Sequence, residues 1–210
     1  MSEECQLIHK IFNNLPRLKF PFNNEAIPLN GIYILFEKGH TGHNLDRIVR
    51  IGTHTGNNQL RSRVNQHFLL ENKDRSIFRK NIGRAILNSR RDPYLKIWEI
   101  DLTSREKRIK FNYLLNRKYQ SQIEKELSKY IQDYFSFCVF EVEDKGKRKD
   151  LESKLISTIS LCNECGPSKE WLGMYSPKEK IKSSGLWQVN ELYKNPLSKN
   201  DFLELKLLIK

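Results

Sequence analysis

The sequence has no apolar run approaching the roughly 18 residues that cross a bilayer, and its first thirty residues lack the apolar core of a secretory signal. Cysteine is scarce: four occur in 210 residues, and their positions (Cys5, Cys138, Cys162, Cys165) do not form the pattern of a disulfide framework. These absences argue against a membrane-spanning protein and against a small disulfide-stabilised domain. We therefore expect a cytoplasmic protein with reduced cysteines and no membrane partner.

Two of the cysteines, Cys162 and Cys165, form a CxxC pair. Tetrahedral zinc needs four ligands, and no second pair of cysteines follows to supply the other two. We therefore interpret this pair as structural or incidental.

Acidic residues are also in short supply. The chain has 25 Asp and Glu against 37 Lys and Arg, which gives a formal net charge of +12. Such a surplus favours association with polyanions, of which nucleic acid is the commonest soluble one, although solubility alone would also explain it. An aromatic content of 10% argues against a disordered chain, and 210 residues without repeats or low-complexity linkers fit one domain.

Apolar periodicity predicts a β-hairpin and several helices. In the run 31–36 alternate residues share a face, with Ile32, Ile34 and Phe36 on one side and Tyr33 and Leu35 on the other. A polar turn separates this run from a second one at 47–53, so the two should pair in antiparallel orientation. We further expect a strand at 135–142, a short strand at 94–100, helices at about 59–70, 76–88, 104–133 and 148–161, and a short amphipathic segment at 202–209.

The helix expected at 148–161 carries a single acid on its apolar face. At 100° per residue, Glu152 falls inside the roughly 140° arc of the apolar side chains, which are Leu151, Leu155, Ile156, Ile159 and Cys162. A carboxylate in this place is costly unless a cation, a metal ion or hydrogen bonds compensate its charge. The alternative is that Glu152, one turn into the helix, reaches solvent or interacts with the helix N-terminus. Helical geometry alone leaves both interpretations open.

The helix expected at 59–70 places two basic side chains beside its apolar stripe. Arg63 and His67 are four residues apart and therefore lie on one side of the helix, next to the stripe of Leu60, Val64 and Phe68. A guanidinium in this position could bind phosphate oxygens bidentately. The other interpretation is an ordinary solvated basic face, and the spacing taken alone favours it.

Tyr33 and Arg50 lie on the two strands of the predicted hairpin. A tyrosine is a poor base unless a neighbouring cation stabilises its phenolate, and an arginine across the ladder could supply that cation. Taken alone, the two residues are better explained as a cross-strand contact at the surface.

These features become informative through their order along the chain. The segments "GIYILFE", "RIVRIGTHT", "LRSRVNQHF" and "RKDLESKLIST" follow one another in an arrangement that resembles the GIY-YIG nuclease superfamily. Two further stretches, 76–87 and 167–190, resemble a prokaryotic subgroup close to the restriction endonucleases. The core of the resemblance covers residues 29–70 and 135–165.

The resemblance implies an α+β fold, in which a small antiparallel sheet of the hairpin and a third strand is flanked by helices. It also implies hydrolysis of DNA phosphodiesters with one Mg²⁺ or Mn²⁺ per active site and no organic cofactor. By position, Tyr33 would orient or deprotonate the attacking water, Arg63 would bind the scissile phosphate, and Glu152 would hold the metal ion. His67 would assist the tyrosine or the phosphate, and Asn163 approximates the family's downstream asparagine.

One departure from the family pattern concerns the general base. The first letter of the YIG motif is Arg50 in this chain, so the second family tyrosine is missing. Some restriction-type relatives carry a basic residue there as well, so we expect an active enzyme with Arg50 in its catalytic site. The resemblance also favours metal ligation by Glu152 over a surface position.

Residues 71–134 form a basic helical insertion between the arginine-bearing helix and the third strand, and residues 166–210 extend the core at its C-terminal side. We interpret 1–210 as one domain whose insertion grips the DNA backbone, because phosphate contacts give affinity. For any single residue, a solvated position on a helical cap is the alternative. The basic residues expected to bind DNA are Arg61, Arg75, Arg79, Lys80 and Arg84.

The expected function is that of a metal-dependent DNA endonuclease of restriction-modification or defence type. Two alternatives stay open: a non-catalytic nucleic-acid-binding module on the same scaffold, and a DNA repair nuclease that needs a partner protein. One active site per chain favours a homodimer if both DNA strands are cut.

Overall fold

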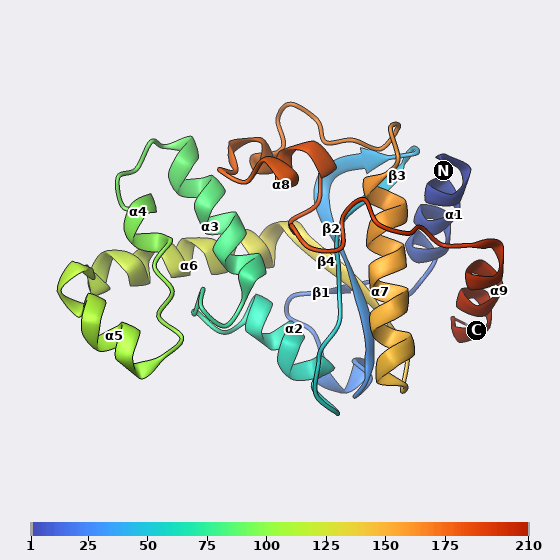
Figure 1. Ribbon diagram of the computed structural model, residues 1–210, viewed down its shortest axis with the longest axis horizontal. Coiled ribbons are helices and arrows are strands. Elements are labelled where there is room, and N and C mark those ends of the chain that lie inside the picture. Colours follow the sequence, from blue (N-terminus) through green and yellow to red (C-terminus); the bar gives the residue numbers. More distant parts are fainter. Residues whose placement is uncertain (1, 210) are drawn as a thin grey trace.

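A four-stranded antiparallel sheet lies at the centre of the molecule. The structure is a computed structural model that describes residues 2–209. The strands of the sheet follow the order β1 (Leu18–Lys19), β4 (Phe135–Glu141), β2 (Gly31–Gly42) and β3 (Leu45–Gly52), as Figure 1 shows. The predicted hairpin and its third strand are confirmed, and β1 adds a short fourth strand. Strand β2 is therefore paired on both sides, whereas β3 lies at an edge.

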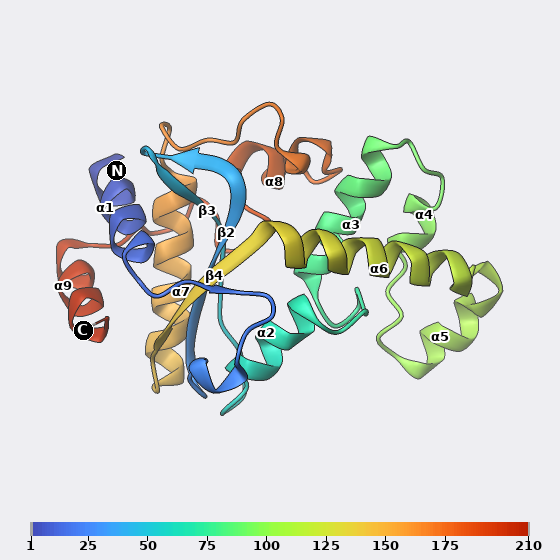
Figure 2. The same cartoon turned by 180° about the vertical axis from the view of Figure 1, so that it is seen from behind.

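The two faces of β2 pack against different helices, as its alternating sequence predicts. One group of helices is α1 (Ser2–Asn13), α7 (Lys145–Ser160) and α9 (Lys199–Leu208), and the other is α2 (Leu60–Phe68), α3 (Ile77–Ser89) and α6 (Arg117–Tyr134). Ile32, Ile34 and Phe36 belong to the core formed with the first group, whereas Tyr33 and Leu35 belong to the core formed with the second. Figures 1 and 2 show the sheet between these two groups of helices.

The N-terminal helix α1 is a finding of the structure, because the sequence analysis assigns no helix to residues 1–27. Its apolar side chains Cys5, Ile8 and Phe12 are three and four residues apart and are fully buried against the sheet. Acidic residues in its first turn and Lys10 in its last turn complement the helix dipole. A 3₁₀ helix, η1 (Asn24–Ala26), precedes β2.

Two predictions for the insertion are wrong. The strand expected at 94–100 is instead a short helix, α4 (Leu95–Trp98), preceded by a turn in which the Tyr94 N–H donates to Asp92 Oδ1 at 2.8 Å. The helix expected at 104–133 is divided into α5 (Arg105–Phe111), a 3₁₀ turn η2 (Asn112–Leu114) and α6. The division occurs because the Asn116 side chain accepts the Tyr119 N–H at 2.9 Å and caps a new helix.

The C-terminal extension covers the open edge of β3. It contains the 3₁₀ helix η3 (Leu172–Tyr175) and α8 (Glu179–Ser184), and then passes alongside β3. The Trp187 N–H donates to the Val49 carbonyl at 2.7 Å, and the Ile51 N–H donates to Gln188 Oε1 at 3.1 Å. These bonds satisfy backbone groups that an edge strand would otherwise expose, so the extension is part of the core structure.

No helix within residues 2–209 is both long enough and apolar enough to cross a membrane.

Candidate active site at the edge of the sheet

A cleft of about 620 Å³ opens beside the edge strand β3. Its walls come from β3, α2, α3, α7 and the C-terminal extension, and they include Arg50, Thr53, Arg63, Asn81, Lys149, Glu152, Gln188, Asn190 and Glu191. A second cleft, of about 330 Å³, extends over α2 and shares Thr53, His54, Thr55 and Arg63 with the first. The fold therefore brings Glu152 from α7 to the same cleft as Arg50 on β3 and Arg63 on α2.

Glu152 lies near the middle of α7, because this helix begins at Lys145 and not at 148 as expected. The residue is therefore beyond the first helical turn, which removes the interpretation based on the helix N-terminus. Its Oε1 accepts a hydrogen bond of 3.0 Å from the Thr53 backbone N–H, just past the end of β3. Burial raises the pKa of Glu152, while the charge of Arg50 and the bond from Thr53 oppose this rise. The structure supports a compensated carboxylate on the cleft wall.

Tyr33 and Arg50 form a buried pair, so the interpretation as a surface contact is wrong. Arg50 Nε donates to Tyr33 Oη at 3.2 Å, and Arg50 Nη1 donates to the Trp187 carbonyl at 2.7 Å. Tyr33 lies opposite Gly52 in the ladder, where a Cβ would be only 2.1 Å from Tyr33 Oη. The absence of a side chain at Gly52, the glycine of the "RIG" segment, therefore provides the space that the Tyr33 phenol occupies.

His67 is fully buried beside the same tyrosine, so a solvated basic face is wrong for this residue. Its Nε2 lies 2.8 Å from Tyr33 Oη, and its Nδ1 lies 2.7 Å from Ser76 Oγ. Burial, together with the charges of three nearby arginines, holds the pKa of His67 well below its usual value. The imidazole is therefore neutral and connects the phenol to the start of α3.

We expect this neutral His67 to make the protein less stable in mild acid. The unfolded chain binds a proton at His67 below a pH of about 6.5, whereas the folded chain does not, because its pKa is lower. Each further pH unit should lower the free energy of unfolding by up to about 1.4 kcal/mol through this residue. Chemical denaturation at several pH values between about 7 and 5 should show a shallower pH dependence for His67→Gln than for the wild type. Parallel curves would contradict a neutral His67.

Arg63 points to the cleft while His67, on the next turn of α2, points to the core. Arg63 Nη1 donates to Gln66 Oε1 at 3.1 Å and to the Arg75 carbonyl at 3.2 Å. These two acceptors hold the guanidinium where the two clefts meet. The arginine is thus partly exposed and has a fixed orientation.

The structure does not bring Asn163 to the cleft. This residue is exposed and lies past the end of α7, about 12 Å or more along the helix from Glu152 at 1.5 Å per residue. The amides on the cleft wall are those of Asn81, Gln188 and Asn190, which the sequence analysis does not single out. They belong to the segments 76–87 and 167–190, which the sequence analysis singles out as whole stretches without naming these amides as site residues.

The structure places three of the basic residues expected to bind DNA, Arg79, Lys80 and Arg84, inside the insertion and not on its surface. Arg79 is fully buried and donates to Glu124 Oε2 from Nε and Nη2 at 3.1 and 2.7 Å. Arg84 makes two bonds of 2.7 Å to the Glu99 carboxylate, and Lys80 Nζ donates to the Glu99 carbonyl at 2.9 Å. A buried cation needs such partners, so these side chains hold α3 against α6 and the segment after α4.

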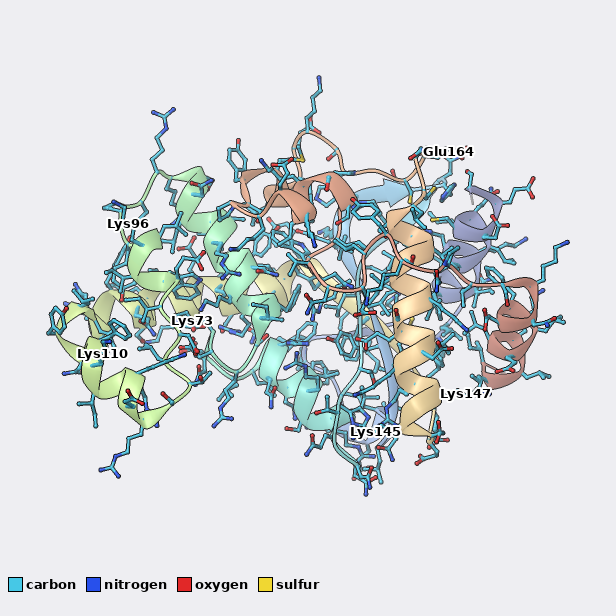
Figure 3. All side chains as sticks on the ribbon, in the orientation of Figure 1. Lys73, Lys96, Lys110, Lys145, Lys147 and Glu164 are labelled. Atoms are coloured by element: carbon cyan, nitrogen blue, oxygen red, sulfur yellow. The ribbon has the colours of Figure 1, made fainter. Side chains whose placement is uncertain are left out.

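The other two predicted residues remain accessible. Arg75 is exposed, and Arg61 is half-buried with its Nε bonded to the Ile27 carbonyl at 2.7 Å. Further exposed lysines lie at the outer end of the insertion, where Figure 3 shows Lys96 and Lys110. Of the predicted DNA-binding surface, the accessible part is therefore Arg61, Arg75 and the exposed lysines of the outer insertion.

The family model of the GIY-YIG domain matches residues 6–207 of this chain. No curated protein and no solved structure gives a match. The matched range runs from α1 to α9, so it contains the insertion and the C-terminal extension as well as the sheet. It also contains every residue of the cleft described above. The chain therefore belongs to the GIY-YIG domain family.

Proposed function

We propose that the protein is a metal-dependent DNA endonuclease that hydrolyses phosphodiester bonds and acts in restriction or defence. Membership of the GIY-YIG family indicates a nuclease. The observation that carries the proposal is that the Glu152 carboxylate and the Arg63 guanidinium share one cleft, next to the Arg50 that binds Tyr33. Metal-assisted phosphodiester hydrolysis needs a cation ligand and a phosphate-binding cation at the same place.

The surroundings of Glu152 fit a divalent cation. Mg²⁺ prefers oxygen ligands, keeps several waters and is often bound through one or two carboxylates. Within residues 2–209 no basic side chain pairs directly with Glu152, whereas the other carboxylate on the cleft wall, Glu191, is bound to Lys194 at 2.9 Å. Bound at Glu152, Mg²⁺ or Mn²⁺ would supply Lewis-acid stabilisation of charge on the phosphate and the departing oxygen.

The hydrogen-bond donors around Tyr33 support it as the general base. Ser76 Oγ accepts the Arg79 N–H at 3.2 Å, so its own hydrogen is free to bond His67 Nδ1. In the tautomer that this bond favours, with the proton on Nε2, His67 donates to Tyr33 Oη, which also accepts from Arg50 Nε. An oxygen that receives two N–H groups can carry the charge of a phenolate. In this proposal Arg50 replaces the missing second tyrosine by supporting that charge.

The positions of these groups limit where the reaction takes place. Tyr33 is buried directly behind Arg50, so the attacking water has to bind beside Arg50 at the cleft wall. Arg63 retains N–H groups beyond those bonded to Gln66 and Arg75, and they are available to the oxygens of the scissile phosphate. The phosphate would therefore lie between Arg63 and Glu152.

Cleavage of supercoiled plasmid DNA tests the proposal. We expect nicked or linear products with Mg²⁺ or Mn²⁺ and none with EDTA. DNA binding without cleavage by either metal, over a broad panel of DNAs, would favour a non-catalytic binding module. Parallel digestion of methylated and unmethylated genomic DNA tests the restriction role, and cleavage only in the presence of a second protein would favour a repair nuclease.

We expect Arg75 to contribute to DNA affinity without contributing to sequence specificity. Arg75→Ala should weaken the binding of any duplex and should reduce the slope of log affinity against log salt by about one, the value for one lost phosphate contact. Lys206→Ala is the matched control, because Lys206 is exposed on α9, on the far side of the sheet in Figure 1. Fluorescence anisotropy with labelled DNA, in the absence of divalent metal, measures both. Equal effects of the two substitutions would contradict the expected surface.

A further inference from the structure

A cluster of cysteine and histidine side chains lies at one corner of the molecule, away from the cleft. Cys5 and His9 come from α1, His43 from the turn between β2 and β3, and Cys162 and Cys165 from the loop after α7. Potential ligand atoms of Cys5, His9, His43 and Cys165 all lie within 4.8 Å of one another. Figure 3 shows Glu164, which lies between the two loop cysteines, at this corner beside α1 and the end of α7.

Two separations within the cluster match those of a tetrahedral zinc site. Zn–S and Zn–N bonds of about 2.3 and 2.0 Å place the ligand atoms of a tetrahedron about 3.3–3.8 Å apart. Cys5 Sγ lies 3.3 Å from Cys165 Sγ, and Cys162 Sγ lies 3.4 Å from His43 Nε2. All the cysteines are free thiols and are buried.

His43 is oriented as a metal-binding histidine would be. Its Nε2 faces the thiols, while its Nδ1 lies 3.8 Å from a carboxylate oxygen of Glu164. Metal-bound histidines commonly direct their second ring nitrogen at a carboxylate, which fixes the ring and its tautomer. His43 also adopts a φ of 52°, which is uncommon outside glycine, at the tight hairpin turn. The backbone therefore holds this imidazole over the cluster.

His9 is better placed to support the site than to bind the ion. Its Nδ1 lies 3.6 Å from Cys5 Sγ but also 3.0 Å from the Cys5 carbonyl, and its Nε2 accepts the Ile48 N–H at 3.3 Å, so both ring nitrogens have backbone partners. Cys162, in contrast, accepts the Glu164 N–H at 3.4 Å, and this bond shapes the CxxC loop around its sulfur atoms. The adjacent Gly42 leaves room for the cluster, since a Cβ there would meet Cys165 Cβ at 3.0 Å and His9 Nε2 at 3.2 Å.

We propose that this corner binds one structural Zn²⁺ through Cys5, Cys162, Cys165 and His43. Four protein ligands leave no open position, so the ion would stabilise the fold and take no part in hydrolysis. It would join α1, the hairpin tip and the end of α7, three segments that are far apart in the sequence. The hairpin tip lies nine residues along β2 from Tyr33, about 30 Å at 3.3 Å per residue. Thiolates select zinc, whereas the Glu152 carboxylate of the cleft suits Mg²⁺, so the two sites are chemically distinct.

The metal content of the full chain tests this proposal. Protein purified in reductant, then passed through EDTA and desalted, should retain about one zinc per chain by elemental mass spectrometry. Cys165→Ser and Cys162→Ser should lose zinc and unfold at a lower temperature. Cys138→Ser should keep zinc, because Cys138 is buried in the same core but its thiol contacts the Phe12 carbonyl outside the cluster. Glu152→Gln should also keep zinc, so this result does not depend on cleavage activity.

Cobalt reconstitution makes the test independent of how well the variants fold. Wild-type protein stripped under denaturing conditions and refolded with Co²⁺ should show thiolate-to-cobalt charge transfer and the intense visible bands of tetrahedral cobalt. Wild-type protein without bound zinc, or a Cys5–Cys165 disulfide found by mass spectrometry without reductant, would overturn the site. Retention of zinc by Cys162→Ser with its loss from His9→Gln would overturn the assignment of the fourth ligand.

Discussion

Glu152→Gln should reduce DNA cleavage by roughly three orders of magnitude, comparable to the loss of a key electrostatic group in other active sites. The amide keeps the size of the side chain, and its carbonyl oxygen can still accept the Thr53 N–H. It lacks the negative charge that binds a divalent cation, so higher Mg²⁺ or Mn²⁺ concentrations should restore little activity. Initial rates of plasmid cleavage over a range of metal concentrations measure this loss.

Asp150→Asn is the matched control for this variant. Asp150 lies two residues earlier on the same helix, is exposed, and pairs with Lys154 at 2.8 Å outside the cleft. It should cleave at the wild-type rate, and all three proteins should unfold at similar temperatures. Wild-type cleavage by Glu152→Gln would show that this carboxylate does not hold the catalytic ion.

Tyr33→Phe should reduce the cleavage rate by roughly 10²–10⁴-fold, the range typical of a lost general base. The ring should still fit over Gly52, so the change removes only the oxygen that accepts from Arg50 and contacts His67. Because the phenol lies behind the cleft wall, DNA affinity should stay near that of the wild type. We therefore expect the loss in kcat and little change in KM, measured on a short labelled duplex that contains one cleavage site.

Tyr94→Phe controls for the removal of a buried hydroxyl. The Tyr94 hydroxyl contacts the Asn116 carbonyl and Gln120 within the insertion, at 3.3 and 3.2 Å, and Tyr94 does not line the cleft. This variant should cleave like the wild type. Equal losses in both variants would indicate a structural effect, and a wild-type rate for Tyr33→Phe would transfer the role of base to another group.

The parts of the fold that follow from local pattern were predictable. The alternation in β2 assigned Ile32 and Ile34 to one core and Tyr33 to the other, and both assignments are confirmed. The insertion was harder, because Asn116 caps a new helix and Asp92 forms a turn through side-chain hydrogen bonds that apolar periodicity does not reveal. Helix α1 carries an amphipathic repeat as well, at Leu7, Ile8, Ile11 and Phe12, so it too was predictable although the sequence analysis assigns no helix there.

Charge was the least reliable guide to the candidate site. A basic residue in the sequence looks the same whether it faces solvent, as Arg75 does, or pairs with a buried acid, as Arg79 does with Glu124. Because burying an unpaired charge is costly, an arginine can be buried only where an acid is available to pair with it. For Arg79 that acid, Glu124, lies on another helix. Similarly, the sequence offered no partners for the CxxC pair, because only the fold places Cys5 and His43 beside it.

By itself, the sequence determined the hairpin, the buried face of each strand and the ordered motif that indicates a GIY-YIG nuclease, because periodicity and motif order are properties of neighbouring residues. The tertiary structure alone decided which arginines are inside, which amides line the cleft, and that a thiol from the first helix meets two from the other end of the chain. These facts depend on contacts between distant segments, which form only when the β-sheet brings its flanking helices together.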